Sequence, residues 1–302
     1  MAVILCGFTK ISYGQCCSPG NPAAGAASVG TIAKKSLRLT TFYRHSFSDT
    51  YYKEGNTIAE NQQKAKANFN YIGEIITYGI TKKLTVETEI GYFINKSKKD
   101  IYQDLTTKGF STSVFSLKYN LLKTKRDLEI TLGAGAKVPF TQKAVIGEYE
   151  IPFTDDMQPS THAFGYIGQL FIAKSYPKHQ LKVILMNRFE TNYKNPDGYK
   201  FGDALFTSLF ISKSFLTHYT FLVQFRNENR DIDKKYVEDV GYTTFTSTGS
   251  NVVFLSPQLS CTLPHKFNVA AMVDFPISRN YKGIQLGPKF AWGLSLIKGF
   301  QF

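Results

Sequence analysis

The chain has 302 residues, 43% of them hydrophobic, and a formal net charge of +13 at pH 7. This hydrophobic share excludes a disordered chain, and 25 Phe with 18 Tyr exceed what an ordinary soluble core needs. No run of about 18 apolar residues occurs, which excludes a transmembrane helix and leaves a transmembrane β-barrel open.

The chain begins with a short apolar stretch that leads into a small-x-small pattern at Ser12 and Gly14. We interpret residues 1–14 as an export signal, short at its start, so that the true first residue could lie upstream. The alternative is a buried N-terminal strand. Residues 15–34 are rich in Gly and Ala and are expected to form a periplasmic tail or plug, and residues 35–302 a single barrel domain without a linker.

From about residue 35 onward, apolar and polar side chains alternate within segments of about 10 to 14 residues. The clearest segments are LEITLGAGAKV at 128–138, YTFLVQFRNE at 219–228 and AWGLSLIKGFQF at 291–302. Each predicts a β-strand with one apolar and one polar or small face. Because a soluble β-sandwich alternates in the same way, alternation alone does not decide which face is inside.

The connections decide between these folds, because tight turns alternate with longer gaps along the whole chain. Tight turns are predicted at residues 81–83, 123–126 and 176–178, and longer loops at 47–66, 96–108 and 140–160. The predicted strands are 35–46, 67–80, 83–95, 109–121, 126–139, 161–175, 178–191, 201–213, 216–228, 249–262, 265–277 and 286–302. This even number, with short turns at one rim and long loops at the other, predicts an all-β, closed antiparallel transmembrane β-barrel of about 12 strands in a Gram-negative outer membrane.

Three features of the sequence carry a resemblance to known proteins. The C-terminal strand ends in Phe300 and Phe302, and in this the whole chain resembles bacterial outer-membrane β-barrel proteins. The resemblance implies that these two residues are an assembly signal for the barrel-assembly machinery. Within that class, FSLKYNLL at 115–122 with LEITLGAGAKVPF at 128–140 is similar to the transporter family associated with the MetA pathway of phenol degradation. That similarity implies a channel, and the phenol substrate is not carried over.

Charged side chains of both signs fall on the face predicted to line the lumen. They are expected either to set ion selectivity along a pore or to fill a closed barrel with a salt-bridge network. The selectivity candidates are Arg38, Arg44, Glu87, Glu89, Lys118, Glu129, Lys137, Arg188, Arg226, Glu228 and Asp274.

The net positive charge is not accompanied by any motif that reads nucleic acid, so no nucleic-acid partner is expected. Lysines and arginines scattered over the turns are expected to meet membrane lipid headgroups. The KSKKD stretch at 96–100 is placed on an outer loop, where its cations could bind lipopolysaccharide phosphates or attract anionic solutes.

Three cysteines remain after the predicted signal: Cys16, Cys17 and Cys261. Cys261 is placed at the periplasmic end of its strand, where the N-terminal tail emerges. A disulfide between tail and barrel, free thiols, and a soft-metal site formed by the adjacent pair all stay open. With no His or Met beside the pair, we assign no metal and no cofactor.

Two residues disturb the pattern. Lys298 lies on the lipid-facing parity, where snorkelling or a bulge at Gly299 would relieve it. Pro257 interrupts the tenth strand, although Pro is normally confined to edges or bulges.

Three functions follow from this pattern. The first is a channel or transporter for passive passage of a small solute, and the second is a closed barrel that acts as a subunit or surface receptor with a protein partner in the outer membrane. The third is a hydrolase at the outer rim, in which Asp155, Asp156 and His162 would approach Ser48 or Asp49. No spacing resembles a hydrolase motif, so we expect no enzyme activity.

Overall fold

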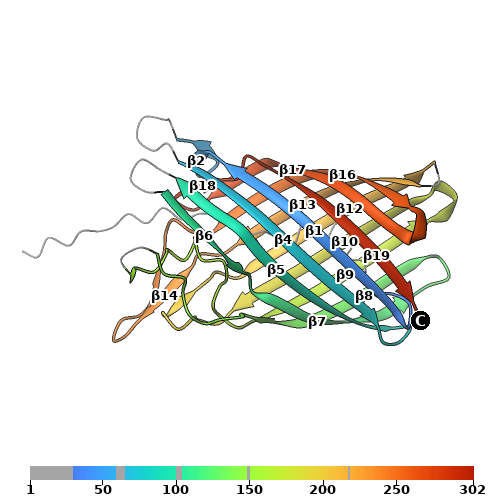
Figure 1. Ribbon diagram of the computed structural model, residues 1–302, viewed down its shortest axis with the longest axis horizontal. Helices are drawn as coiled ribbons and strands as arrows, with labels where there is room; N and C mark the ends of the chain where they lie inside the picture. The colour runs from blue at the N-terminus through green and yellow to red at the C-terminus, as the bar shows by residue number, and fades with distance from the viewer. Residues whose placement is uncertain (1–29, 59–64, 100–103, 148–149, 217) are drawn as a thin grey trace, which may run out of the picture.

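Twelve antiparallel strands close into a barrel in the computed structural model, which describes residues 30–58, 65–99, 104–147, 150–216 and 218–302 (Figure 1). β1 pairs with β4 on one side and with β19 on the other, and the β4–β5 pairing completes the circle. The strands are β1 (Ser36–Ser48), β4 (Lys66–Gly79), β5 (Leu84–Lys99), β7 (Ser113–Lys123), β8 (Leu128–Val138), β9 (Gly165–Tyr176), β10 (Leu181–Asn192), β12 (Ala204–Phe215), β13 (Tyr219–Arg230), β16 (Ser250–Leu263), β17 (Phe267–Tyr281) and β19 (Phe290–Gln301).

The predicted fold class and strand number are confirmed. Closure gives the backbone donors and acceptors of every spanning strand a partner on a neighbour, as a membrane-exposed sheet requires. One predicted strand, 109–121, is divided in the structure. Its start belongs to β6 (Asp104–Phe110), which pairs with the C-terminal part of β5, and β7 begins after Ser111 and Thr112.

Short turns and longer loops lie at opposite ends of the barrel. The short turns connect β4 to β5, β7 to β8, β9 to β10, β12 to β13 and β16 to β17, and two of them contain the 3-10 helices η3 (Pro177–His179) and η4 (Pro264–Lys266). The end that carries these turns, the start of β1 and the end of β19 is the periplasmic end by the rule for such barrels.

Two small sheets decorate the opposite, extracellular end, on the left of Figure 1. One consists of β2 (Thr50–Lys53), β3 (Asn56–Thr57) and β18 (Ile284–Gly287). The other consists of β11 (Tyr199–Lys200), β14 (Lys234–Val237) and β15 (Gly241–Thr244). Most of their residues come from the predicted connections between strands. Leu286 and Gly287 of β18 fall in the last predicted strand, 286–302, which begins only at Phe290 in the structure.

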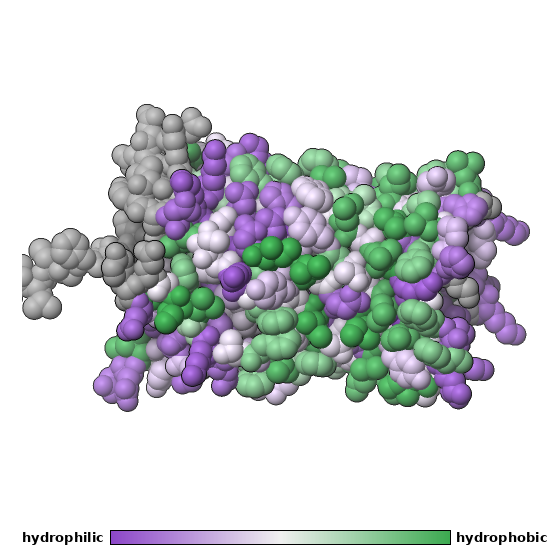
Figure 2. Space-filling view, in the orientation of Figure 1, coloured by the Kyte–Doolittle hydropathy of each residue, from purple (hydrophilic) through white to green (hydrophobic). Residues whose placement is uncertain are grey.

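The outer surface of the barrel wall is apolar. Leu117 of β7 and Leu294 of β19 are 53% and 49% exposed, and many other large apolar side chains face the same way. Figure 2 shows green and pale residues over the middle of the barrel and purple ones toward its ends. Within the described residues, no helix is both long and apolar enough to span a membrane. Such a surface is stable in contact with lipid acyl chains, because the acyl chains keep water away from its apolar side chains.

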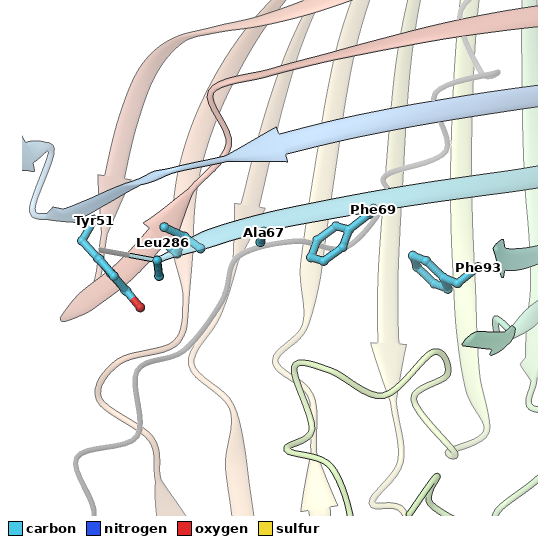
Figure 3. Close-up of a cluster of buried hydrophobic side chains, with 6 residues drawn as sticks. Tyr51, Ala67, Phe69, Phe93 and Leu286 are labelled. Atoms are coloured by element: carbon cyan, nitrogen blue, oxygen red, sulfur yellow. The ribbon is translucent and has the colours of Figure 1, made fainter. Parts of the chain in front are cut away.

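The inner surface is mainly polar, with several apolar clusters, of which two are the largest. One cluster, Phe171, Ile184, Met186, Phe210 and Leu222, covers the inner wall of β9, β10, β12 and β13. The other lies at the extracellular end, where Figure 3 shows Phe69 and Phe93 facing one another inside the barrel, near Ala67, Tyr51 and Leu286. The ring centroids of Phe69 and Phe93 are 6.4 Å apart in an edge-to-face arrangement.

The two residues that disturb the strand pattern have local solutions. Lys298 bends toward the periplasmic rim, where its Nζ donates to the carbonyl oxygen of His265 and lies 3.9 Å from the Phe267 ring centroid. It therefore snorkels, and the β1–β19 register runs past Gly299 without a bulge. Pro257 pairs with β13. On its other side, the pairing of β16 with β17 is interrupted between Leu255 and Gln258, so the missing N–H of Pro257 costs no hydrogen bond there.

Residues 30–35 lie across the periplasmic mouth of the barrel. The Ile32 amide donates to Thr85 Oγ1 at 3.1 Å, and Thr85 is a buried residue on the inward face of β5. The Lys35 amide donates to the carbonyl oxygen of Gly79 at 2.7 Å. Most of the predicted signal and tail, including Cys16 and Cys17, lies outside the described residues, so the predicted domain boundaries stay predictions.

Candidate functional site

One group of charges lines the inner wall formed by β1, β13 and β17. Arg44 and Arg226 both contact Asp274 Oδ2, at 2.7 and 3.2 Å, and Arg226 Nε also contacts Glu228 Oε1 at 2.9 Å. Ser256 donates to the other oxygen of Asp274. We call Arg44, Arg226, Glu228 and Asp274 the arginine-side network. It joins strands that are not neighbours in the sheet, so it extends across part of the lumen.

A second group lies on the wall formed by β5, β8 and β10. Arg188 contacts Glu89 at 2.7 Å and Glu190 at 2.8 Å, and Lys137 contacts Glu190 at 2.8 Å. We call these four residues the glutamate-side network. Each of its cations is paired with a carboxylate, so the network contains two positive and two negative charges.

A single ion pair lies closer to the periplasmic end. Lys118 Nζ and Glu87 Oε1 are 2.6 Å apart, both side chains have 0% exposure, and Thr77 donates to the other oxygen of Glu87 at 3.1 Å. Lys118 Nζ also lies 4.9 Å from the Phe171 ring centroid. Removing one partner of such a buried pair leaves an uncompensated charge, which costs on the order of 3–5 kcal/mol.

A cavity of about 310 Å³ occupies the extracellular half of the lumen. Glu89, Arg188 and Glu190 line the periplasmic side of this cavity, so the cavity is continuous with the glutamate-side network. Aromatic side chains line much of the rest: Phe42, Tyr71, Phe93, Tyr199, Phe201, Phe206 and Phe245. We call it the outer cavity, and its volume is at the lower end of the range of small-molecule pockets.

The loop between β8 and β9 forms one side of the outer cavity. Lys98 pairs with Asp156 at 3.2 Å, Lys96 Nζ donates to the Gln158 carbonyl oxygen at 2.9 Å, and Thr107 donates to that of Met157 at 2.7 Å. Met157 is completely buried. These contacts fix the loop against the inner surface of β5 and β6.

Acidic residues gather at the outer rim of this cavity, above the membrane-spanning strands. Burial raises the pKa of Asp155 to about 6, and the nearby carboxylates of Asp156, Asp197 and Asp233 act in the same direction. Burial also raises the pKa of Asp233, although the Tyr199 hydroxyl donates to it at 2.6 Å. The rim therefore loses negative charge as the pH falls through about 6, the pKa of Asp155.

The structure places the predicted lumen residues on the inner face. Eight are buried: Arg44, Glu87, Lys118, Lys137, Arg188, Arg226, Glu228 and Asp274, while Arg38, Glu89 and Glu129 are half-buried. All join the two networks or the Lys118 pair except Arg38 and Glu129. Glu129 pairs with Lys123 at 2.6 Å at the periplasmic rim. Whether any of them sets selectivity stays a prediction.

The outer-loop assignment of KSKKD is wrong for Lys96 and Lys98. Strand β5 continues to Lys99, and a bulge between Phe93 and Lys96 inserts an extra residue that reverses the direction of the following side chains. Both lysines are buried inside the barrel, where they hold the β8–β9 loop. They are not available to lipopolysaccharide phosphates.

Two functional candidates were missed from the sequence. Arg230 lies on the same parity as Arg226 and Glu228 and lines the outer cavity, so extending the alternation by two residues would have found it. Glu74 lies among the lipid-facing residues of β4, where Thr41 donates to it at 2.5 Å. Glu74 shares the parity of the exposed Ile72 and Ile76, and an outward carboxylate gave no recognisable signal.

The remaining predicted sites have simple surroundings. Cys261 lies near the periplasmic end of β16, on the parity of the exposed Leu259 and Leu263, and forms no disulfide within the described residues. Phe300 and Phe302 are exposed, at 40% and 73%. Their roles in a disulfide and in assembly stay predictions.

The hydrolase arrangement is not formed by the residues suggested for it. His162 is buried, and its ring nitrogens contact the Thr141 carbonyl oxygen at 3.0 Å and Gln158 Oε1 at 3.2 Å. Asp49 instead pairs with Lys289 at 2.7 Å. Among the described residues, no three His, Cys, Asp or Glu side chains are grouped as metal ligands.

Comparison with solved structures gives a clear relative in fold. An outer membrane channel from Pseudomonas putida F1 matches with a TM-score of 0.69 over 91% of this chain and 98% of that one, at 10% identity. The chain is an outer-membrane β-barrel. The translocator domain of the autotransporter NalP from Neisseria meningitidis (TM-score 0.49, 10% identity, 90% of both chains) and the KdgM porin (TM-score 0.45, 11% identity, 87% of this chain and 99% of that one) also match. No family model and no curated protein matches the sequence. At such identities the likeness shows the fold of this outer-membrane barrel and not its substrate.

Proposed function

We propose that this barrel is a passive channel through which a small solute crosses the outer membrane. The observation that carries the proposal is the outer cavity, whose walls continue into the glutamate-side network at Glu89, Arg188 and Glu190. A solute that enters from outside would therefore meet the acidic rim first, then the aromatic walls, and then the charged side chains of the glutamate-side network.

The charge distribution supports this proposal physically. An ion or polar solute loses part of its hydration in a narrow lumen with low-dielectric walls, which costs free energy. Charged side chains on the inner wall reduce this cost. The outer face exposes apolar side chains to lipid, so the polar path is confined to the lumen. The channel fold of the Pseudomonas putida relative fits the same function.

A closed structural or receptor barrel is the second candidate. The Lys118–Glu87 pair favours it, because two side chains with 0% exposure in the periplasmic half resemble a filled interior. Such a barrel would bind a protein partner in the outer membrane or act as a subunit, and it would conduct no ions.

The narrower expectations belong with this proposal. The similarity of residues 115–122 and 128–140, now seen as β7 and β8, to the MetA-pathway transporter family is consistent with a channel. Lysines and arginines of the exposed loops would bind lipopolysaccharide. Folding would depend on the barrel-assembly machinery, which would recognise Phe300 and Phe302. We expect no enzyme activity.

Single-channel recording of the refolded full chain in a planar bilayer tests the proposal. A channel gives steady current steps that grow with salt concentration, and Glu87→Gln or Arg226→Gln changes their size or ion preference. Heat-modifiable migration of the folded protein on a gel serves as the control for insertion of intact barrels. Silence from folded, inserted protein would favour the closed barrel.

A further inference from the structure

Several arginine nitrogens inside the barrel have no hydrogen-bond partner among the described residues. They are Arg38 Nε and Nη2, Arg44 Nη1, Arg226 Nη1 and Arg230 Nη2. Arg230 Nη2 is 3.8 Å from Glu228 Oε2, beyond hydrogen-bond distance. Buried polar groups in proteins nearly always have a partner, so each of these donors calls for an occupant that the described residues do not supply.

These donors belong to two strands and follow the length of the lumen. Arg230 lines the outer cavity, and Arg226 lies four residues closer to the periplasm on β13, about 13 Å along the strand. Arg44 is joined to Arg226 through Asp274, and Arg38 lies on β1 six residues closer to the periplasm than Arg44. The four guanidiniums, which we call the arginine ladder, therefore connect the outer cavity with the periplasmic end.

Within the ladder, guanidiniums outnumber the carboxylates that they contact. Asp274 and Glu228 are the two contacting carboxylates, and Glu190 and Asp233 act on Arg230 from farther away. The carboxylate that acts on Arg38 is Glu87, which is already held by Lys118 and Thr77. The glutamate-side network has equal numbers of each charge and no free arginine nitrogen among the described residues. Water would satisfy the free donors, whereas an anion would satisfy them with stronger, charge-assisted hydrogen bonds.

The side chains of Arg44 and Arg226 are deeply buried, with 9% and 3% exposure, and both keep one free Nη1. A planar guanidinium offers paired N–H groups that match a carboxylate in geometry and charge. Aromatic rings lie beside two rungs of the ladder: Phe206 is 5.1 Å from Arg230 Cζ and Phe254 is 4.6 Å from Arg226 Cζ. These rings provide an apolar surface for the body of an organic anion.

We propose that the channel selects small organic carboxylates, which pass along the arginine ladder from Arg230 through Arg226 and Arg44 to Arg38. The inference rests on the proposed function, because it assumes that a solute crosses the lumen. Each guanidinium keeps only part of its hydrogen-bonding capacity in contacts with protein. A carboxylate can thus bind one rung and move to the next without breaking the ion pairs that hold the wall.

The experiment compares two probes of nearly equal size and opposite charge, benzoate and benzylammonium, in planar bilayers that contain the refolded full chain. Wild type is expected to pass benzoate at least about threefold better than benzylammonium. Arg230→Gln and Arg44→Gln should each reduce this preference, since each removes one rung. Arg44→Gln leaves Asp274 paired with Arg226, which protects the fold.

Two further variants serve as controls. Arg230→Lys keeps the charge but loses the planar fork, so it should keep chloride preference over potassium and lose part of the benzoate preference. Lys289→Gln removes a cation of an extracellular loop, outside the lining of the outer cavity, and should leave the preference unchanged.

The outcomes separate the two proposals. Conductance without preference for benzoate, or a preference that survives both glutamine substitutions, overturns the arginine ladder and leaves the channel standing. Silence from folded, inserted wild type removes the channel and the ladder together. Loss of preference in both glutamine variants, with Lys289→Gln unchanged, supports the ladder.

Discussion

Lys118 Nζ lies 2.6 Å from Glu87 Oε1 inside the barrel, and neither side chain is exposed. Lys118→Met would leave the carboxylate of Glu87 without this partner and should lower the free energy of unfolding by about 3 kcal/mol. The double variant Lys118→Met/Glu87→Met should recover part of the loss, because the uncompensated carboxylate is then gone and only Arg38 loses a nearby opposite charge. Urea unfolding of the barrel in lipid vesicles measures both, and equal losses in the single and double variants would contradict this account.

The periplasmic mouth should open further when residues 30–35 are displaced. A Cβ on Gly79 would lie 2.0 Å from the carbonyl oxygen of Ala33, so Gly79→Ala must push the tail away from the wall. We expect larger single-channel conductance in this variant. Gly299→Ala is the matched control at the same rim, since a Cβ there has nothing within 4 Å. Equal conductance of both variants would show that the tail does not limit passage.

The charge of the outer cavity should depend on pH through Asp155. Its pKa is raised by burial to about 6, above the ordinary value of 3.8, so the folded protein binds this proton more tightly than the unfolded chain does. Protonation therefore stabilises the folded loop as pH falls below about 6, with the gain complete below about 3.8. It also removes a negative charge from the cavity, so preference for anions should increase over the same window.

Asp155→Asn tests this pH dependence directly. The variant should show at pH 7 the anion preference that wild type reaches only in acid, and its own preference should change little between pH 7 and 5. Lys99 and Asp104 form an exposed pair away from the cavity, so Asp104→Asn serves as the control. A pH dependence that persists in Asp155→Asn would assign it to another group.

The lipid-facing carboxylate of Glu74 should destabilise the barrel. Its hydrogen bond from Thr41 compensates only part of the cost of a polar group against hydrocarbon. Glu74→Leu is expected to raise the free energy of unfolding by about 1 kcal/mol, and Thr41→Val should have little further effect in that background. Vesicle unfolding with urea measures the change. A loss of stability would mean that Glu74 has a structural partner beyond Thr41.

The sequence by itself determined the strands and their faces. In β13, Phe225 points to lipid and Arg226 to the lumen because side chains alternate in any extended chain, and turn residues at regular intervals set the number of strands. This local rule holds without knowledge of any neighbour. The end of β5 was not predicted: the strand continues through a bulge after Phe93, so Lys96, expected on an outer loop, points into the barrel.

Only the tertiary structure decided which charges meet. Arg44 and Asp274 are far apart in the sequence, and they pair because barrel closure brings β1 and β17 to either side of β19. The inward fold of the β8–β9 loop and the free nitrogens of the arginine ladder follow likewise from register and closure. Alternation fixes the direction of a side chain, whereas its neighbours across the lumen depend on the positions of all twelve strands together.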